Sequence, residues 1–356
     1  MEYKKSQMEN LGRLKKFFNN KKILITGITG FTGSWMSIFL QNFNCKIYGF
    51  GLHPITTPNL FHLTKIQNFT NTEIIDIRDK KKVFDFVKKS NPDILIHLAA
   101  QPLVIESFKN PAFTFETNFN GTLNLLEVCR FQKKLKKIII FTTDKVYKNS
   151  DKKNFIFKES ENLSGSDPYS SSKCTVEELV KCYSNHFLKK KNISIIRAGN
   201  IIGGGDWSEN RLIPDIINSW KNKKTLLVRG LGNSRPWQHV TDVVILVCKL
   251  IIKQNKNFYS SFNLSLNNKS TSVKKVISEA KKYLSFEHKM TSRNNKVDKL
   301  YLNLNSSKIK KFLKYSHAMN TKKSIQFTIE WYKKYYNNEF SAKNLCLRDF
   351  KKNFKF

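Results

Sequence analysis

The sequence is poor in acidic residues: 27 Asp and Glu stand against 63 Lys and Arg, which gives a formal net charge of +36. A nucleic-acid-binding protein uses such charge to neutralise phosphates and concentrates it on one face or in a recognised motif. Here the lysines are spread along the whole chain, together with many Asn, Ile and Phe. These four residues share A/T-rich codons, so a biased genome explains the charge, and we expect no nucleic-acid partner.

A long apolar run is also missing. A membrane-spanning helix needs about 20 apolar residues, whereas the longest candidate, residues 243–252, is shorter and is interrupted near Lys249. Residues 1–20 form a polar leader without the apolar stretch and small-residue cleavage site of a signal peptide. We therefore expect no membrane partner and a cytoplasmic location.

Paired cysteines are absent as well. The six cysteines lie far apart and form no C-x-x-C pair. Zinc sites and disulfide frameworks depend on such spacing. The sequence therefore predicts reduced thiols and no metal site.

Short β-rich runs alternate with segments of helical apolar spacing. The strand-like runs are residues 22–26, 45–50, 73–77, 94–98, 137–142 and 193–197, and the helical ones are 31–43, 80–89, 112–131 and 170–188. This alternation predicts an α/β protein whose residues 21–199 form a Rossmann-type, doubly wound parallel sheet with helices on both faces.

The rhythm changes at the glycine cluster 203–205. A helix is expected at 213–220 and a strand at 225–229. Residues 200–336 are therefore predicted to form mainly a smaller mixed α/β lobe, interleaved with the first domain. Residues 337–356 are expected to be a basic, irregular tail.

Three glycines, Gly27, Gly30 and Gly33, stand at G-x-x-G-x-x-G spacing, where the first strand turns into the first helix. Glycine permits unusual dihedrals and lets main-chain N–H groups approach a pyrophosphate at the positive end of the helix. The turn, which includes Phe31 and Thr32, therefore predicts a dinucleotide site. The alternative is a tight turn with a glycine packed against the sheet.

The acidic residue that often follows the second strand of dinucleotide-binding proteins, where it binds the adenosine ribose, is missing. Residues 49–53 read Gly-Phe-Gly-Leu-His, so this position does not distinguish NAD from NADP. Asp76, at the end of the third strand-like run, is a candidate partner for the adenine amino group. An equal alternative is a helix cap before Lys80.

A tyrosine and a lysine four residues apart, Tyr169 and Lys173, fall on one face of a predicted helix. An ammonium beside a phenol lowers the pKa of the phenol, as a general base for an alcohol requires. Thr142, Thr143 and Asp144 leave a neighbouring strand at its carboxyl end, the edge where open α/β sheets bind ligands. The sequence predicts that these groups form one catalytic site.

Eight motifs carry a resemblance to a known family. They are GITGFTGSW (27–35), HLAAQPLV (97–104), TNFNGTLNLLE (117–127), TTDKVY (142–147), DPYSSSK (167–173), RAGNIIGGGDW (197–207), RLIPDI (211–216) and RPWQHV (235–240). Over about residues 21–308 the chain resembles the extended short-chain dehydrogenase/reductase family, in particular its nucleotide-sugar 4,6-dehydratases. The TDK triplet and the RAGNIIGGGDW and RPWQHV blocks resemble the members that act on CDP-glucose. The resemblance implies NAD as cofactor, CDP-glucose as substrate, and homodimers or higher homo-oligomers that pair through helices such as 112–131 and 170–188.

The resemblance also implies a redox cycle that returns its cofactor. Tyr169, assisted by Lys173 and Thr143, would take the proton of the sugar 4-hydroxyl while hydride leaves C4. The new carbonyl acidifies the C5 hydrogen, Asp144 protonates the departing 6-hydroxyl, and hydride returns to C6. Lys145 would assist at C5, although most dTDP-glucose relatives have glutamate there and a lysine acts as a base only when neutral.

Binding roles follow from the same match. Beside the glycine turn, Tyr169 and Lys173, the implied NAD contacts are Asp76, Ile77, Leu98, Ala99, Ala100 and Asn118. The implied substrate contacts are Asn200, Arg211, Leu212, Arg235, His239 and Tyr301. Guanidinium groups suit a diphosphate, with ordinary surface salt bridges as the alternative for both arginines. For His239 a packed core position is an equal alternative.

Two rival functions stay open. A sugar-nucleotide 4-epimerase or 4-reductase would share Tyr169 and Lys173 but has no need of the Asp144–Lys145 pair. A non-catalytic regulatory or nucleic-acid-binding protein could keep the dinucleotide fold alone. The intact Tyr169 and Lys173 argue against the second.

Overall fold

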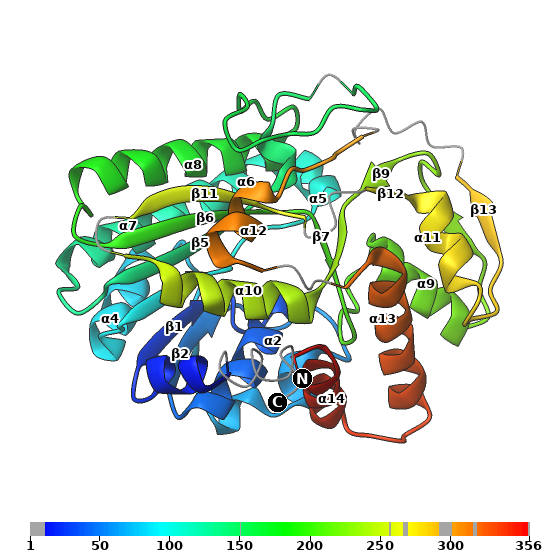
Figure 1. The fold of residues 1–356 in the computed structure, drawn as a ribbon, viewed down its shortest axis with the longest axis horizontal. Coiled ribbons are helices and arrows are strands. Elements are labelled where there is room, and N and C mark those ends of the chain that lie inside the picture. Colours follow the sequence, from blue (N-terminus) through cyan, green and yellow to red (C-terminus); the bar gives the residue numbers. More distant parts are fainter. Residues whose placement is uncertain are drawn as a thin grey trace.

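A seven-stranded parallel sheet forms the centre of the protein (Figure 1). The computed structural model describes residues 11–149, 151–255, 258–265, 270–291, 301–315 and 319–354. In spatial order the strands are β11 (Tyr259–Leu264), β6 (Asn192–Ala198), β5 (Lys137–Thr143), β4 (Ile94–His97), β1 (Lys22–Thr26), β2 (Lys46–Gly51) and β3 (Asn71–Ile74). The strand order reverses between β1 and β4, and the carboxyl edge at such a point is where α/β sheets bind ligands. The predicted Rossmann-type fold is confirmed.

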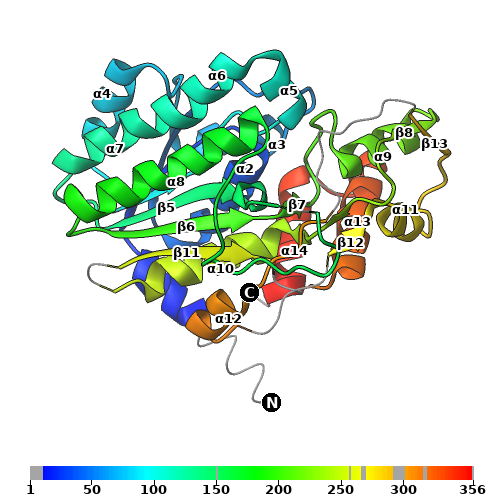
Figure 2. The ribbon, with the colours of Figure 1, turned by 90° about the horizontal axis from the view of Figure 1, so that it is seen from above.

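Helices cover both faces of the sheet, which explains why its central strands are apolar throughout. All four residues of β4 and all seven of β6 are buried. One face carries α4 (Lys80–Ser90), α7 (Gly121–Phe131) and α8 (Pro168–His186), and Figure 2 shows α7 and α8 lying side by side. The other carries α2 (Phe31–Leu40) and α10 (Val240–Lys253). The sheet thus separates two apolar cores.

The third strand lies earlier than predicted. The run 73–77 was the expected strand, whereas β3 spans Asn71–Ile74. β3 pairs only with β2, and Ile74 lies opposite Gly51, the last residue of β2. Pairing therefore stops there, and Asp76 follows the strand in a loop.

The long helix predicted at 112–131 is present but not uniform. It begins as α6 (Pro111–Phe115), passes through a π-helical turn (Glu116–Asn120) and continues as α7. Such turns within helices are frequent at functional sites. Asn118, one of the predicted site residues, lies in this turn and is buried.

A smaller lobe lies beside the carboxyl edge of the sheet (Figures 1 and 2). It contains α9 (Leu212–Lys221), α11 (Val273–Ala280) and three two-stranded sheets. These sheets pair β7 (Asn200–Ile202) with β10 (Trp237–His239), β8 (Leu226–Val228) with β13 (His288–Met290), and β9 (Ser234–Arg235) with β12 (Thr271–Ser272). The predicted helix 213–220 and strand 225–229 are confirmed as α9 and β8. The remaining helices are α3 (Leu60–Leu63), α5 (Val104–Lys109), α12 (Ser307–Leu313), α13 (Thr321–Tyr336) and α14 (Ala342–Phe354).

Both chain ends are more ordered than predicted. Residues 11–18 of the expected polar leader are helical, with Leu14 and Phe18 buried; residues 1–10 lie outside the described part. The expected irregular tail contains α14, so that prediction is wrong. Apolar residues at helical spacing explain α14, because Phe350 is buried and its ring lies 5.3 Å from Trp35 and 4.7 Å from Phe39, both on α2.

The apolar run 243–252 lies in α10, whose buried residues form part of the core beneath the sheet. Among the described residues, no helix has the length and apolar character needed to cross a membrane.

The packing of α14 on α2 can be tested with Phe350→Ala. Removing this ring should lower the free energy of unfolding by about 3–5 kcal/mol, because the cavity is enclosed by Trp35 and Phe39. Phe340→Ala is the matched control, since its side chain is 48% exposed, and its effect should stay within about 0.5 kcal/mol. Urea unfolding followed by circular dichroism measures both. An unchanged midpoint for Phe350→Ala would contradict a packed α14.

Candidate functional site

The glycine turn lies between β1 and α2, at the reversal of strand order. Gly27 has a φ of +69°, and a Cβ there would come within 2.8 Å of the main-chain nitrogen of Ala99. Only glycine fits this close approach without strain. Gly30 is the N-cap residue of α2 and donates its main-chain N–H to the carbonyl of Gly27, 3.1 Å away. The turn therefore presents the positive end of α2 beside the carboxyl ends of β1 and β4.

The predicted cofactor residues after β4 surround this turn. Leu98 and Ala99 donate their main-chain N–H groups to Thr26 Oγ1, both at 3.2 Å, and Ala100 is half-buried like them. Asn118 accepts a hydrogen bond from the main chain of Gln101 at 2.8 Å and donates to Ser172 Oγ at 2.9 Å. Asn118 thereby links the loop after β4 to α8, and its cofactor contact stays a prediction.

Asp76 is not a helix cap. Its carboxylate accepts hydrogen bonds from Arg78, with an ion pair of 2.7 Å, and this hydrogen bonding lowers the pKa of Asp76. The cap of α4 is Asp79, which accepts from the main chain of Lys82 at 3.1 Å. The capping alternative is therefore wrong, whereas the adenine contact stays a prediction.

The side chain of Ile77 packs in the core, where it faces Gly121. The main-chain oxygen of Ile77 accepts a hydrogen bond from Asn124 Nδ2 at 3.2 Å. The NAD contact predicted for Ile77 stays a prediction.

A pocket at the carboxyl edge of the sheet, bordered by the lobe, brings most of the predicted site together. The predicted residues that line it are Phe31, Thr32, Thr143, Asp144, Lys145, Tyr169, Asn200, Arg211, Leu212 and Arg235. They come from the glycine turn, the end of β5, the start of α8, β7, α9 and β9. Residues more than 200 positions apart in the chain thus face one cavity.

Thr143, Asp144 and Tyr169 form the polar floor of this pocket. Thr143 ends β5, and its hydroxyl donates to Asp144 Oδ1 at 3.2 Å and shares a hydrogen bond with the Tyr169 phenol. Asp144 is 3% exposed, and within the described residues its Oδ2 has no hydrogen-bond partner. Burial raises the pKa of Asp144, against the opposing charges of Arg235 and Lys145. A carboxyl with a raised pKa can keep its proton and act as an acid.

Tyr169 and Lys173 lie one turn apart on α8, as predicted, and both are buried. Burial raises the pKa of Tyr169 to about 12, although the hydrogen bond with Thr143 opposes this rise. Burial also lowers the pKa of Lys173 to about 8, while Glu177 favours its charged form. The predicted lowering of the Tyr169 pKa is therefore wrong for this structure, because desolvation of the phenol outweighs the surrounding charges.

The two arginines predicted to bind phosphate differ in their surroundings. Arg211 precedes α9 and forms an ion pair of 3.2 Å with the buried Asp206, with its own side chain 35% exposed. Arg235 is 5% exposed and donates to the carbonyl of Ser234 at 2.9 Å. Both line the pocket. The surface salt bridge considered for each arginine therefore does not apply to the buried Arg235. Arg211 forms an ion pair and also faces the cavity.

His239 belongs to the core. Its ring is fully buried against Trp35 and Phe327, and Nδ1 lies 2.7 Å from Thr241 Oγ1. Burial lowers the pKa of His239 to about 3, so the ring is neutral. The core alternative is confirmed, and the predicted substrate contact is not supported, because the ring is fully buried among core side chains and does not line the pocket.

Tyr301 is bridged to Ser234, the residue before Arg235. Its carbonyl accepts a hydrogen bond from Asn149 Nδ2 at 2.8 Å. Tyr301 is therefore close to the pocket wall without lining the pocket itself. Its predicted contact with the nucleotide stays a prediction.

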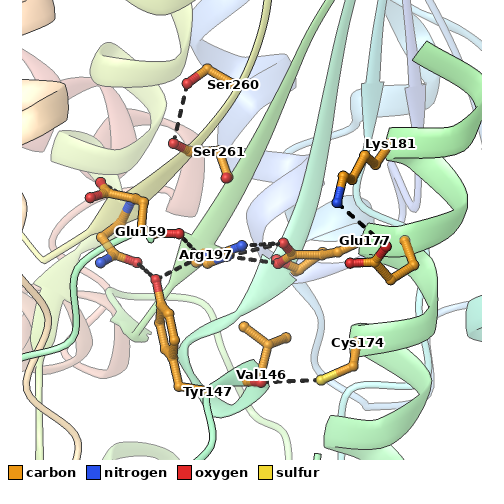
Figure 3. Close-up of polar contacts among 12 residues, drawn as sticks. Val146, Tyr147, Glu159, Cys174, Glu177, Lys181, Arg197, Ser260 and Ser261 are labelled. Atoms are coloured by element: carbon orange, nitrogen blue, oxygen red, sulfur yellow. Dashed lines mark hydrogen bonds and ion pairs between the residues drawn. The ribbon is translucent and has the colours of Figure 1, made fainter. Parts of the chain in front are cut away.

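A buried ion pair that the sequence did not reveal joins the catalytic elements (Figure 3). Arg197 on β6 binds both carboxylate oxygens of Glu177 on α8, with a shortest distance of 2.6 Å and about 5% exposure for each side chain. Glu177 also accepts a hydrogen bond from Thr142 on β5 at 2.7 Å. Arg197 further donates to the Tyr147 hydroxyl at 2.8 Å. The pair thus fixes the end of β5, which carries Thr143 and Asp144, against the helix that carries Tyr169.

The importance of this pair can be tested with Glu177→Gln. The substitution leaves the Arg197 charge buried without a counter-charge, so the free energy of unfolding should fall by about 3–5 kcal/mol. Glu178→Gln is the control on the same helix, because Glu178 is 68% exposed and 3.8 Å from Lys181, and exposed pairs contribute about 0–1 kcal/mol. Chemical denaturation measures both. Equal effects of the two substitutions would show that the pair has no special role.

Across the described ranges, no group of three or more His, Cys, Asp or Glu side chains could hold a metal ion. The groups that line this pocket include the buried Asp144 carboxyl, the Tyr169 phenol, the Lys145 side chain and the guanidinium groups of Arg211, Arg229 and Arg235.

Comparisons with known proteins agree with this geometry. The model of the GDP-mannose 4,6 dehydratase family matches residues 24–339. The chain is 31% identical to CDP-glucose 4,6-dehydratase of Salmonella typhimurium over 91% of this chain and 94% of that protein. It is 28% identical to dTDP-D-glucose 4,6-dehydratase of Homo sapiens, over 89% and 91%.

Among solved structures, MoeE5 in complex with UDP-glucose and NAD superimposes with a TM-score of 0.77. The identity is 18%, over 88% of this chain and 99% of that one, so this likeness concerns the fold. The family match covers most of the chain, and with the glycine turn and the Tyr169–Lys173 pair it leads to one conclusion: the chain belongs to the GDP-mannose 4,6 dehydratase family, within the extended short-chain dehydrogenases/reductases.

Proposed function

We propose that this protein is a hydro-lyase that converts CDP-glucose to CDP-4-keto-6-deoxyglucose and water with NAD as a recycled cofactor. The observation that carries the proposal is Asp144. It is a buried carboxyl with a raised pKa and a free oxygen, and it lines the same pocket as Tyr169 and Thr143. Loss of water needs an acid at the departing hydroxyl, whereas a 4-epimerase or 4-reductase does not.

The glycine turn supports NAD as the cofactor. Gly27, Gly30 and Gly33 would hold the pyrophosphate at the start of α2. The segment after β4 would lie beside it, because the lack of a Cβ at Gly27 lets the main chain of Ala99 approach the turn closely. When bound, NAD would supply the hydride acceptor for oxidation at C4 and the hydride donor for reduction at C6. Side chains of the protein would carry out every other step.

Tyr169 is the proposed base for the sugar 4-hydroxyl. Thr143 hydrogen-bonds the phenol and so keeps it oriented toward the pocket. Because burial raises the Tyr169 pKa, proton removal needs a cation beside the phenol during the reaction. Lys173 is the proposed cation: with a pKa of about 8, it is mainly charged at neutral pH.

Asp144 is the proposed acid of the elimination. After oxidation at C4, the C5 hydrogen leaves as a proton, the C6–O bond breaks, and the hydroxyl departs with the proton of Asp144 as water. Lys145 also lines the pocket and is proposed to assist at C5. The nucleotide is proposed to bind to Asn200, Leu212, Arg211 and Arg235. The guanidinium groups of the two arginines would bind its diphosphate.

We propose CDP-glucose rather than another nucleotide sugar as the substrate for two reasons. The chain is 31% identical to a CDP-glucose enzyme over 91% of its length, and 28% identical to a dTDP-glucose enzyme over 89%. The blocks around Lys145, Arg197 and Arg235 also resemble the members that use CDP-glucose.

We further propose a homodimer that pairs through α7 and α8. The two helices lie side by side on the outer face of the sheet (Figure 2). Phe131 at the end of α7 and Phe187 after α8 are 62% and 49% exposed. The guanidinium of Arg130 lies over both rings, which form an apolar patch suited to a partner.

The role of Tyr169 is tested by Tyr169→Phe. Loss of the hydroxyl should lower kcat by about 10²–10⁴-fold, since among the described residues no other tyrosine lines the pocket. Tyr183→Phe on the same helix is the control, because Tyr183 contacts Glu127 and does not line the pocket. Product formation followed by chromatography measures both. Equal rates for Tyr169→Phe and wild type would refute the assignment.

The reaction is tested by incubating the purified protein with NAD and CDP-glucose, dTDP-glucose or GDP-mannose in separate samples. We expect a 4-keto-6-deoxy product from CDP-glucose alone. Asp144→Asn cannot supply the proton, so it should oxidise C4 and accumulate reduced nicotinamide while product formation falls by about 10²-fold or more. CDP-galactose as product would instead identify an epimerase, and full dehydration by Asp144→Asn would remove the acid from the mechanism.

A further inference from the structure

One carboxylate in the pocket has no part in the proposed chemistry. Asp215 lies in the first turn of α9 and lines the cavity. Its carboxylate accepts a hydrogen bond from the main chain of Asn210. Within the described residues, no side chain donates a hydrogen bond to the Asp215 carboxylate or forms a salt bridge with it. Asp215 therefore has acceptor capacity left for a ligand.

The position of Asp215 indicates which part of a nucleotide sugar it would meet. The reacting sugar belongs beside Thr143 and Tyr169, at the end of the sheet, and the diphosphate belongs beside Arg211 and Arg235. A nucleotide sugar is linear, so its base extends beyond the diphosphate into the lobe. Asp215 lies in the lobe, one turn into the helix that follows Arg211, and its main-chain N–H donates to the carbonyl of Arg211 at 2.9 Å.

The lobe end of the pocket also offers apolar walls for a base. Leu212 on α9, Val228 on β8 and Val273 on α11 all line the cavity. These elements are neighbours, because α9 packs against both β8 and α11. A planar base can thus lie between apolar side chains while its edge meets Asp215.

We infer that Asp215 is a specificity-determining residue that accepts a hydrogen bond from the exocyclic amino group of cytosine. Cytosine carries an N4 donor at the edge where thymine carries an O4 acceptor, and uracil shares that acceptor. A carboxylate attracts the donor and repels the acceptor, so one residue both favours cytosine and disfavours its rivals. This inference rests on the proposed use of CDP-glucose.

The charge state of Asp215 suits this role. Burial raises its pKa to about 6, and the nearby Arg229 opposes that rise, whereas Glu209 and Asp206 add to it. At neutral pH the side chain is therefore mainly ionised and can act only as an acceptor. Arg229 lines the same part of the pocket and donates to the carbonyl of Asn210 at 3.4 Å.

The test compares the binding of CMP and UMP to the full-length protein by isothermal titration calorimetry. Wild type should bind CMP roughly 10-fold or more tightly than UMP, as expected for a hydrogen bond to a charged group. Asp215→Asn should bind the two within about 3-fold of each other, because an amide can donate to O4 as well as accept from N4. Glu209→Gln is the matched control, since Glu209 is a nearby acid that does not line the pocket, and it should keep the wild-type ratio.

Each other outcome has a definite meaning. If Asp215→Asn keeps the preference for CMP, Asp215 does not read the base. If the substitution weakens CMP and UMP equally, the carboxylate binds the ribose hydroxyls instead, and the inference is likewise wrong. If wild type itself does not prefer CMP, the proposed CDP-glucose substrate fails together with the inference. Asp215→Ser, with a thermal melt of every variant, separates a binding effect from a folding defect.

Discussion

The buried ion pair between Arg197 and Glu177 holds the reacting groups of this protein in one arrangement. It connects β6 and α8 directly, and through Thr142 it also connects β5 to both of them. Because Thr142 shares the carboxylate, the last residues of β5 cannot shift without disturbing α8. The distance between Asp144 and Tyr169 is therefore set by an electrostatic clamp outside the pocket.

Burial then sets the proton chemistry inside the pocket. The same low-dielectric surroundings raise the pKa of Asp144 and of Tyr169 and lower the pKa of Lys173. Each shift disfavours the charged form of its side chain. The surroundings therefore favour the neutral form of all three groups until a charged ligand binds. In the proposed complex, a negatively charged diphosphate beside Arg211 and Arg235 would change this balance and so couple substrate binding to the ionisation of these groups.

Much of the fold could be predicted from sequence, because parallel strands buried on both faces leave unmistakable apolar runs, as in β1, β4 and β6. The sequence pattern was less informative where tertiary contacts determine the bounds or the presence of an element. β3 ends where its partner β2 ends, which no local signal records. The helical α14 looked irregular because its basic face masked Phe350 and the other buried residues.

The site was predictable in its residue types but not in their surroundings. The motifs brought Thr143, Asp144 and Tyr169 to one pocket, as expected. His239 failed as a substrate contact because only the packing of Trp35 and Phe327 around it reveals a core position. Glu177 and Arg197 were missed as a pair because they lie on different elements, although Glu177 follows Lys173 by one helical turn.

The contact between α14 and α2 has a consequence for folding. α2 begins at the glycine turn, and its inner face is completed by Phe350, which follows it by more than 300 residues. Closing so long a loop costs chain entropy before the contact can stabilise anything. The core behind the glycine turn is therefore completed only when two distant segments of the polypeptide have met.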